Sequence, residues 1–207
     1  MTLRAGQAKL RRMQSFREVL TGLLREQIAR QPGWRVLEVA PHTDLATIPD
    51  SVFHALLYAR GPGGLGERQI ALRESHRILV DGGCIGLALA NAKNRYVMAL
   101  REALADHQST VFDAGEDEPL ETLLRFAGFV DVAVSSSMFN MRLEPTQQWL
   151  LRDTAGTPYA GPIASMDAPT RVAMLRRISA SLKDLWRIDS FEVPVSVQFT
   201  HGRKGRP

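Results

Sequence analysis

The sequence predicts an α/β fold, an open sheet that carries helices on both faces. Residues 52–59 have the pattern of a buried strand, residues 67–79 have helical spacing, and residues 84–90 form a continuous apolar run. A strand, a helix and a second strand in this order imply a right-handed crossover onto a parallel sheet. A length of 207 residues, with 44% hydrophobic and 23% charged residues, is typical of one domain with a full core.

The N-terminal part of the chain is expected to be one long amphipathic helix. Apolar residues recur at helical spacing from Ala8 to Arg30, and Gln31–Gly33 ends the run. A strand at 34–40 follows, which is rich in apolar and β-branched residues and closed by a proline. We therefore separate the N-terminal helix, residues 1–33, from a main domain at 34–207.

Helices and strands continue to alternate toward the C-terminus, after a turn expected at Asp81–Gly83. Asp167 followed by Pro169 is typical of a helix N-terminus. We expect helices at 94–106, 118–128, 144–152 and 168–186, and strands at 130–136 and 192–200. The helices at about 144–187 are expected to form a small cap inserted before the last strand.

Charge, cysteine and histidine content argue against several classes of function. The net charge is +4, but no helix-turn-helix, zinc-finger or aromatic RNA-binding signature accompanies it, so we expect no nucleic-acid partner. The single cysteine, Cys84, excludes an internal disulfide and fits a reducing compartment, which we take to be the cytoplasm. No apolar run reaches the length of a membrane span, and we expect no membrane association. His42, His54 and His76 lack metal-ligand spacing, so no metal site is expected.

Three segments carry motifs in a consistent order. Thr43–Ala59 reads TDLATIPDSVFHALLYA, Ala71–Ala90 reads ALRESHRILVDGGCIGLALA, and Leu123–Val134 reads LLRFAGFVDVAV. They resemble the gDAexLPfxdxsFDxV, ALxExxRVLxPGG and LLxxAGFxxVxV elements of class I S-adenosylmethionine (SAM) methyltransferases of the ubiquinone-biosynthesis type. The resemblance implies an incomplete Rossmann-like methyltransferase sheet, with Leu150–Lys204 as the cap helices and closing strand.

The cofactor-binding elements of that family have no counterpart before Trp34. In the family, a GxGxG loop after the first strand brings backbone amides to the cofactor, and an acid after the second strand holds the ribose. Val36–Asp44 (VLEVAPHTD) is one possible first strand and loop, but side chains then stand where glycines are required, and two strands must be deleted. We prefer the alignment in which Asp44 and Leu45 flank the adenine as a vestigial site, and His54 replaces the family's aspartate.

Two further patterns have simpler interpretations. Gly61, Gly63 and Gly66 match a GxGxxG dinucleotide fingerprint after a strand and before a helix, but no acid ends the following strand. We interpret this segment as a loop. Glu74 and Arg77 are three residues apart on one predicted helix, so they are expected to form an ion pair.

These observations lead us to expect a methyltransferase-like protein that does not bind SAM by itself. Methyl transfer depends mainly on holding two reactants in line, so weak cofactor binding removes the activity. The missing strands are expected to leave a central strand edge unpaired, and such an edge normally finds a partner. We therefore expect an accessory protein that forms a homodimer or a heteromer with a catalytic methyltransferase, or that binds a hydrophobic small molecule beneath the cap helices.

Two alternatives stay open. The first is a SAM-dependent methyltransferase of a small lipophilic or phenolic substrate, whose cofactor site is completed by a partner chain or by the loop Pro41–Asp44. The second is a repurposed fold that catalyses cyclisation or isomerisation, with His42 or His54 as acid or base.

Overall fold

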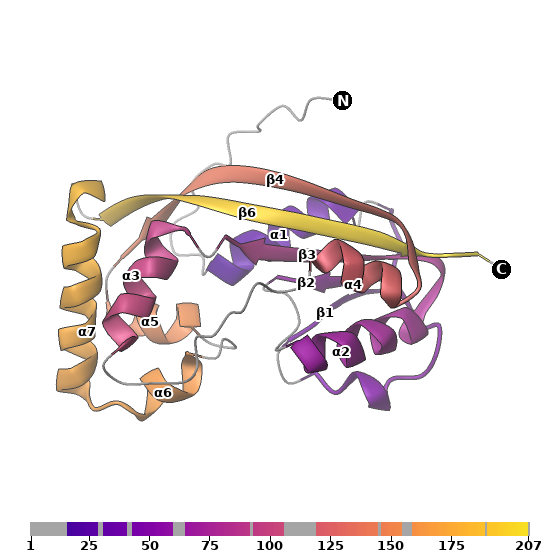
Figure 1. Cartoon of the computed structure of the whole chain (residues 1–207), viewed down its shortest axis with the longest axis horizontal. Helices are drawn as coiled ribbons and strands as arrows, with labels where there is room; N and C mark the ends of the chain where they lie inside the picture. Colours follow the sequence, from indigo (N-terminus) through magenta and orange to yellow (C-terminus); the bar gives the residue numbers. More distant parts are fainter. Residues whose placement is uncertain are drawn as a thin grey trace.

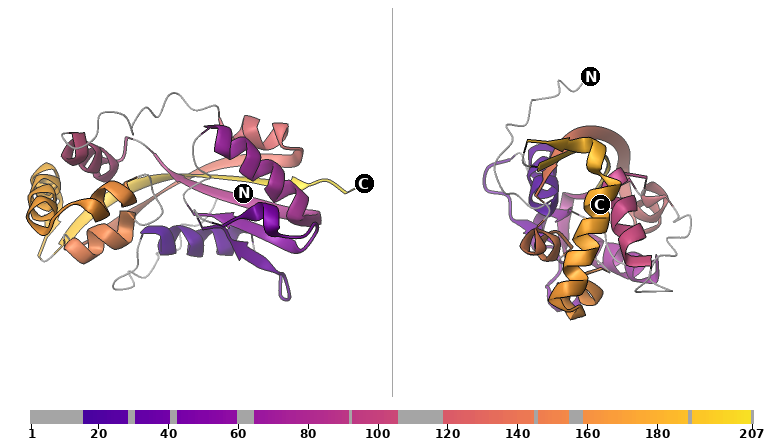
Figure 2. Two further views of the ribbon diagram at one scale, coloured as in Figure 1. Left: turned by 90° about the horizontal axis from the view of Figure 1, so that it is seen from below. Right: turned by 90° about the vertical axis from the view of Figure 1, so that its left-hand side faces the viewer.

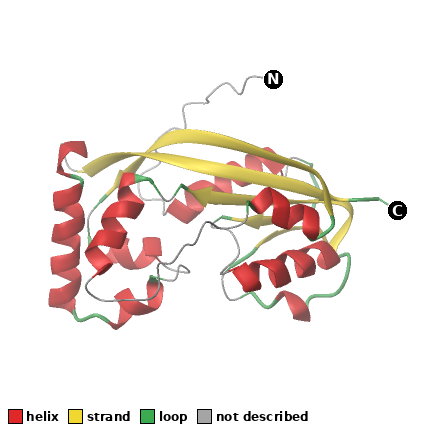
Figure 3. Ribbon diagram, in the orientation of Figure 1, coloured by secondary structure: helices red, strands yellow, loops and turns green. Residues whose placement is uncertain are grey.

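A mixed sheet of six strands forms the centre of the fold (Figure 1, Figure 3). The structure is a computed structural model that describes residues 16–28, 31–40, 43–59, 65–91, 93–105, 119–144, 146–154, 159–188 and 190–206. Its strands are β1 (Val36–Glu38), β2 (Phe53–Tyr58), β3 (Leu79–Ala90), β4 (Phe129–Leu143), β5 (Trp186–Arg187) and β6 (Ser190–Lys204). Their order is β1-β2-β3-β6-β4, with β5 paired to β6. Strands β1 to β3 are parallel and β6 is antiparallel to β3 and β4, which confirms the expected α/β class.

The position of β1 changes the strand assignment made from the sequence. β1 pairs in parallel with β2, from Val36 beside Ala55 to Glu38 beside Leu57. The expectation that this central edge stays unpaired is therefore wrong. In open α/β sheets of the order 3-2-1-4-5-6, the first strand lies beside the fourth. The placement of β1 thus favours the interpretation that we set aside, in which Val36–Asp44 is the first strand and its loop.

The connection between β1 and β2 is short. Between β1 and β2 the described residues form one single-turn 3-10 helix, η1 (Leu45–Thr47). β1 is consequently an outer strand of the described sheet, opposite β4.

Helices cover both faces of the sheet (Figure 2). α1 (Phe16–Ile28) packs on one face, in a core shared with Leu57 and Ala88. α2 (Leu65–Ile78) and α4 (Leu120–Phe126) pack on the other, in a core shared with Leu56 and Ile85. No described helix is both long and apolar enough to cross a membrane.

Four helices gather at one end of the sheet (Figure 1). They are α3 (Arg95–Leu104), α5 (Gln147–Thr154), α6 (Ala160–Ser165) and α7 (Ala168–Ser181), and the single turn η3 (Lys183–Leu185) follows α7. We call α5, α6 and α7 the cap helices, because the chain inserts them between β4 and β6. Asp167 begins α7 as expected, since its side chain accepts a hydrogen bond from the Thr170 amide at 2.8 Å.

Several boundaries differ from those expected. At Asp81–Gly83, where a turn is expected, β3 continues from Leu79 but is distorted, because Phe53 pairs with Leu79 and the next pair joins Ala55 to Cys84. Gly82, at φ 75°, accommodates this distortion. β4 runs to Leu143 because β6 pairs along its whole length, whereas the sequence pattern ended at 136. For the first helix, the expected residues 8–15 lie outside the described residues.

Close packing of α1 on β3 depends on Gly86. A Cβ atom at this position would lie 1.9 Å from Ile28 Cδ1 and 3.3 Å from Leu24 Cδ2. The absence of a side chain therefore lets the helix approach the sheet at this point. Leu20 and Leu24 are fully buried in the resulting interface.

Replacing Gly86 with valine is predicted to destabilise the fold by about 1–3 kcal/mol, because the added methyl groups overpack the contact between α1 and β3. Urea unfolding followed by circular dichroism measures this change. The matched control is Gly22→Ala in α1, where an added Cβ meets no atom within 4 Å. The control is predicted to be stabilising by roughly 0.5–1 kcal/mol, because alanine favours a helix interior. Equal unfolding midpoints for Gly86→Val and the parent chain would contradict the packing argument.

Candidate functional site at the ends of the parallel strands

The carboxyl ends of β1, β2 and β3 lie at one edge of the sheet, on the side where α3 and the cap helices gather (Figure 1). Ligands of open α/β sheets bind outside the carboxyl ends of the strands. The described residues at this edge therefore make up the candidate site. They are Val39, Ala40, Thr43 and Asp44 after β1, Ala59 after β2, and Asn91 and Asn94 after β3.

Three of the described backbone amides after β1 donate within the protein. The Ala40 N–H donates to Thr43 Oγ1 at 3.0 Å, and the Thr43 N–H donates back to the Ala40 carbonyl at 3.0 Å. The Val39 N–H continues the sheet by donating to the Leu57 carbonyl at 2.9 Å. These three amides are therefore occupied at the place where a nucleotide-binding loop presents its donors to the ligand.

Asp44 and Leu45, the residues assigned to a vestigial adenine site, both have structural roles. Asp44 is the N-cap of η1, because its Oδ1 accepts from the Ala46 amide at 3.1 Å. Leu45 is buried in the core beneath α2, with Leu56 and Leu72. A contact of either residue with adenine stays a prediction.

The acidic side chain at the end of β1 also has a partner. Glu38 Oε1 forms an ion pair with Arg25 of α1 at 2.7 Å. This exposed pair connects the helix to the outer strand. Both Glu38 and Asp44 are therefore committed to contacts within the protein.

Arg77 of α2 holds the connection between β1 and β2 in place. Its guanidinium donates to the carbonyls of Leu45 at 2.9 Å and Ile48 at 2.8 Å, and to Asp50 Oδ1 at 2.5 Å. The expected ion pair with Glu74 is confirmed at 2.6 Å. Hydrogen bonding to Glu74, and then to Asp50, raises the pKa of Arg77, so the guanidinium stays charged. Arg77 is therefore the side chain that positions η1.

Tyr58, the last residue of β2, is directed into the core beside α2. Its hydroxyl lies 2.6 Å from Ser75 Oγ, which itself donates to the Ala71 carbonyl at 2.7 Å. Because the serine proton is used there, the tyrosine donates in this pair. Burial raises the pKa of Tyr58 to about 12. Tyr58 thus remains protonated near neutral pH and is not suited to act as a general base.

Asn94 closes the end of β3 against β6. Its side-chain amide donates to the Ser196 carbonyl at 2.9 Å and accepts from the Ser196 amide at 2.8 Å. The Asn91 N–H donates to the same carbonyl at 3.0 Å. The side chain of Asn94 thereby forms the two hydrogen bonds with β6 that a further residue of β3 would form. It does so immediately before α3 begins.

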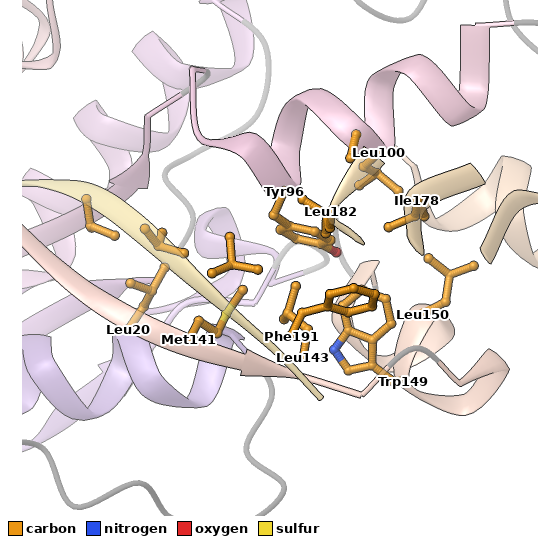
Figure 4. Close-up of a cluster of buried hydrophobic side chains, with 14 of the residues drawn as sticks. Leu20, Tyr96, Leu100, Met141, Leu143, Trp149, Leu150, Ile178, Leu182 and Phe191 are labelled. Carbon is orange, nitrogen blue, oxygen red and sulfur yellow. The ribbon is translucent and has the colours of Figure 1, made fainter. Parts of the chain in front are cut away.

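The described core between α3 and the cap helices is filled by side chains (Figure 4). The rings of Tyr96 and Trp149 lie 5.5 Å apart, and Tyr96 Oη donates to the buried Asp153 Oδ2 at 2.6 Å. An open groove of about 640 Å³ lies instead along α5 and α7. Its lining residues are Gln147, Val172, Leu175, Arg176, Ser179 and Ala180. None of them comes from the strand ends, so a small molecule beneath the cap stays a prediction.

The structure does not bring His54 to the candidate site. His54 lies near the start of β2, roughly 13 Å along the strand from Tyr58 at 3.3 Å per residue. Its Nδ1 accepts from the Arg35 amide at 3.1 Å, and its ring stacks on Trp34 at 6.0 Å. The proton of the neutral ring is therefore on Nε2. His42 lies outside the described residues.

Neither Gly66 nor His76 is among the described residues of the candidate site. Gly66 lies in α2, while Gly61 and Gly63 lie outside the described residues. The His76 ring packs edge-on against Phe129 at 5.1 Å, and burial, followed by the charge of Lys204, lowers the pKa of His76. Among the described residues, no group of three histidine, cysteine or acidic side chains could hold a metal ion.

Cys84 is buried in β3, as the apolar strand pattern predicts. Its Sγ lies 3.8 Å from the His54 carbonyl and 4.0 Å from the Ile28 carbonyl. Burial, only partly offset by the charge of Arg203, raises the pKa of Cys84 to about 11. The thiol is therefore protonated at neutral pH and a poor nucleophile.

The sequence analysis missed the hydrogen bonds of Thr43 and Asn94, and the hydrogen bonds from Arg77 to distant carbonyls. Thr43 follows a proline and a histidine after a strand, which is a turn signal, and its hydroxyl is the kind of group that accepts from a nearby amide. Asn91 and Asn94 flank a turn after β3 in the same way. No local pattern identifies the contacts from Arg77 to Leu45 and Ile48, because they span 32 and 29 residues.

Substituting Arg77 with alanine is predicted to loosen residues 44–50, because two carbonyls of this segment lose their donor. Hydrogen–deuterium exchange measured by mass spectrometry should show faster exchange in peptides covering this segment. Arg125→Ala is the matched control, since Arg125 forms a surface ion pair with Glu121 on α4 at 2.9 Å. Unchanged exchange in the Arg77 variant, or an equal increase in the control, would contradict the positioning role.

The Cys84 thiol is predicted to react slowly with iodoacetamide in the native protein at pH 8, because it is both buried and protonated. Mass spectrometry follows the labelling. The rate should rise strongly once urea unfolds the chain. Rapid stoichiometric labelling of the native protein would show that the thiol is accessible and that this description of β3 is incorrect.

No protein-family model and no curated protein matches this chain. Three solved structures illustrate the similarity of fold. The [4+2]-cyclase SpnF has a TM-score of 0.48 at 15% identity, over 92% of this chain and 81% of the cyclase. A SAM-dependent methyltransferase from Archaeoglobus fulgidus has a TM-score of 0.45 at 14% identity, over 91% of this chain and 94% of the methyltransferase. The YcgJ protein from Bacillus subtilis has a TM-score of 0.43 at 13% identity, over 78% of this chain and 68% of YcgJ. Similarity at this level says nothing about the chemistry of this chain.

Proposed function

We propose that this chain is a methyltransferase-like protein that does not hold SAM by itself and acts as an accessory subunit of a catalytic methyltransferase. The observation that carries the proposal is that three described backbone amides after β1 already have acceptors within the protein. Ala40 and Thr43 use their amides on one another, and Val39 uses its amide on β2. A nucleoside placed at this edge meets none of these three donors.

The acids near this edge support the same proposal. Binding of a ribose diol by a carboxylate requires acceptor oxygens that face the ligand. Glu38 is paired with Arg25, and Asp44 caps η1. No other acid is described in the segments that directly follow β1, β2 and β3.

The expected loss of affinity follows from ordinary hydrogen-bond energies. Each missing hydrogen bond to a cofactor weakens binding by about 1 kcal/mol, and more where a charged group is involved. Because about 1.4 kcal/mol is tenfold, the loss of several such bonds converts a micromolar site into a millimolar one.

Isothermal titration calorimetry of the purified chain with SAM, and separately with S-adenosylhomocysteine, tests the proposal. The predicted result is a Kd above about 1 mM for both ligands. Thr43→Val serves as an informative variant, because it removes the acceptor of the Ala40 amide while preserving the size of the side chain. Low-micromolar binding by the unmodified chain would refute the proposal and favour an ordinary SAM-dependent enzyme.

The accessory role has its own test. Co-expression with a methyltransferase encoded in the neighbouring reading frame should give a stoichiometric complex on size exclusion, and the complex should bind SAM. A methyltransferase that is equally active and equally stable with and without this chain would argue against the accessory role.

A further inference from the structure

The outer strand β4 presents an unpaired edge in the described sheet. β4 has 15 residues and pairs with β6 on one side, and the strand order ends there. In Figure 1 the two strands run together along the length of the molecule, with β4 outermost. An edge of this length offers a row of backbone donors and acceptors to another strand.

An irregularity interrupts β4 between Val130 and Ala133, but beyond it the strand pairs regularly with β6 and lacks the charges and prolines that normally block such an edge. Between Asp131 and Arg142 the sequence reads VAVSSSMFNM, without a charged residue or a proline. Natural edge strands are usually protected by lysine, proline or inward-pointing charges. Here Val134 and Met138 are 39% and 74% exposed. This segment is therefore suited to pairing rather than protected against it.

We propose that β4 pairs in antiparallel orientation with β4 of a second copy of this chain, around a two-fold axis at Ser136. The proposal goes beyond the proposed function, because its partner is a second copy of this chain and not a catalytic methyltransferase. The paired strands join the two sheets into one continuous sheet. An interface of this kind is isologous, since the same strand contributes to both sides.

The register follows from the symmetry and from the exposed side chains. A two-fold axis perpendicular to the sheet pairs residues whose side chains lie on the same face of the sheet. The residue on the axis pairs with the same residue of the second copy. With Ser136 on the axis, exposed Val134 lies opposite Met138 of the second copy, twice in the dimer. Apolar pairs directly opposite one another stabilise antiparallel strands.

The charges at the ends of the strand fit the same arrangement. Asp131 and Arg142 are exposed and lie on either side of the uncharged stretch. Antiparallel pairing brings the acidic end of each strand toward the basic end of the other. A parallel pairing would instead place like charges side by side.

Two other surfaces of the described chain fit a partner less well. The edge of β1 has three residues and offers few backbone groups for pairing. The groove along α5 and α7 is open, but its shape and lining do not identify an occupant. β4 combines length, lack of charge and a self-complementary pattern.

Multi-angle light scattering after size exclusion tests the interface with the full chain. The unmodified protein is expected at twice the 23.0 kDa of one chain. The double variant Val134→Lys/Met138→Lys is expected at the mass of one chain, because it places lysines opposite one another. The control Ile70→Lys changes an exposed apolar residue on α2, whose exposure of 66% lies between those of Val134 and Met138, and is expected to remain a dimer. Circular dichroism verifies that both variants are folded.

Cross-linking tests the register. The only native cysteine is the buried Cys84, so an introduced surface cysteine reacts without background. Ser136→Cys is expected to give a covalent dimer with a short bis-maleimide reagent. Asn140→Cys is expected to give none, because its copy lies roughly 26 Å away along the paired strands at 3.3 Å per residue.

A monomeric unmodified chain, a double variant that remains dimeric, or equal cross-linking at positions 136 and 140 would each overturn the proposal. These outcomes are independent of the calorimetry with SAM. Tight SAM binding by a β4-paired dimer would refute the accessory function and leave the interface standing. A monomer that does not bind SAM would refute the β4 interface and leave the proposed function standing.

Discussion

Reciprocal hydrogen bonds between Ala40 and Thr43 occupy two backbone donors at the carboxyl edge of this sheet. A loop that binds a nucleotide keeps its amides free and brings the backbone close to the ligand, which is why glycine is favoured there. Here the Thr43 hydroxyl and the Ala40 carbonyl take those donors. The turn then leads into η1, which Asp44 caps and Arg77 holds against α2. The edge is therefore built for stability of the fold.

The short connection between β1 and β2 also affects the outline of the described sheet. Because residues 39–52 lead directly from β1 into β2, the parallel half ends after three strands. The antiparallel half, β6 and β4, is much longer and ends in the uncharged stretch around Ser136. The outer strand β1 thus has 3 residues, whereas the opposite outer strand β4 has 15.

Local patterns were sufficient for most of the fold. Apolar runs identified β2 and the buried part of β3, and Asp167 with Pro169 marked the start of α7. The extent of β4 was not predictable, because its exposed middle is strand only through pairing with β6. The neighbour of β1 was also missed, since strand order depends on contacts between distant segments. For the candidate site, the sequence could not show that Asp44 caps η1 or that Leu45 is buried beneath α2, because both roles depend on contacts with other segments.

The most direct test of this account is an NMR titration of the isotopically labelled chain with S-adenosylhomocysteine, following the amide signals of Ala40 and Thr43. The account predicts that both amides stay protected from exchange and unshifted up to millimolar ligand, because each already has an acceptor within the turn. Shifts that saturate at micromolar ligand would contradict it, since they would show the turn opening to give its donors to the nucleoside.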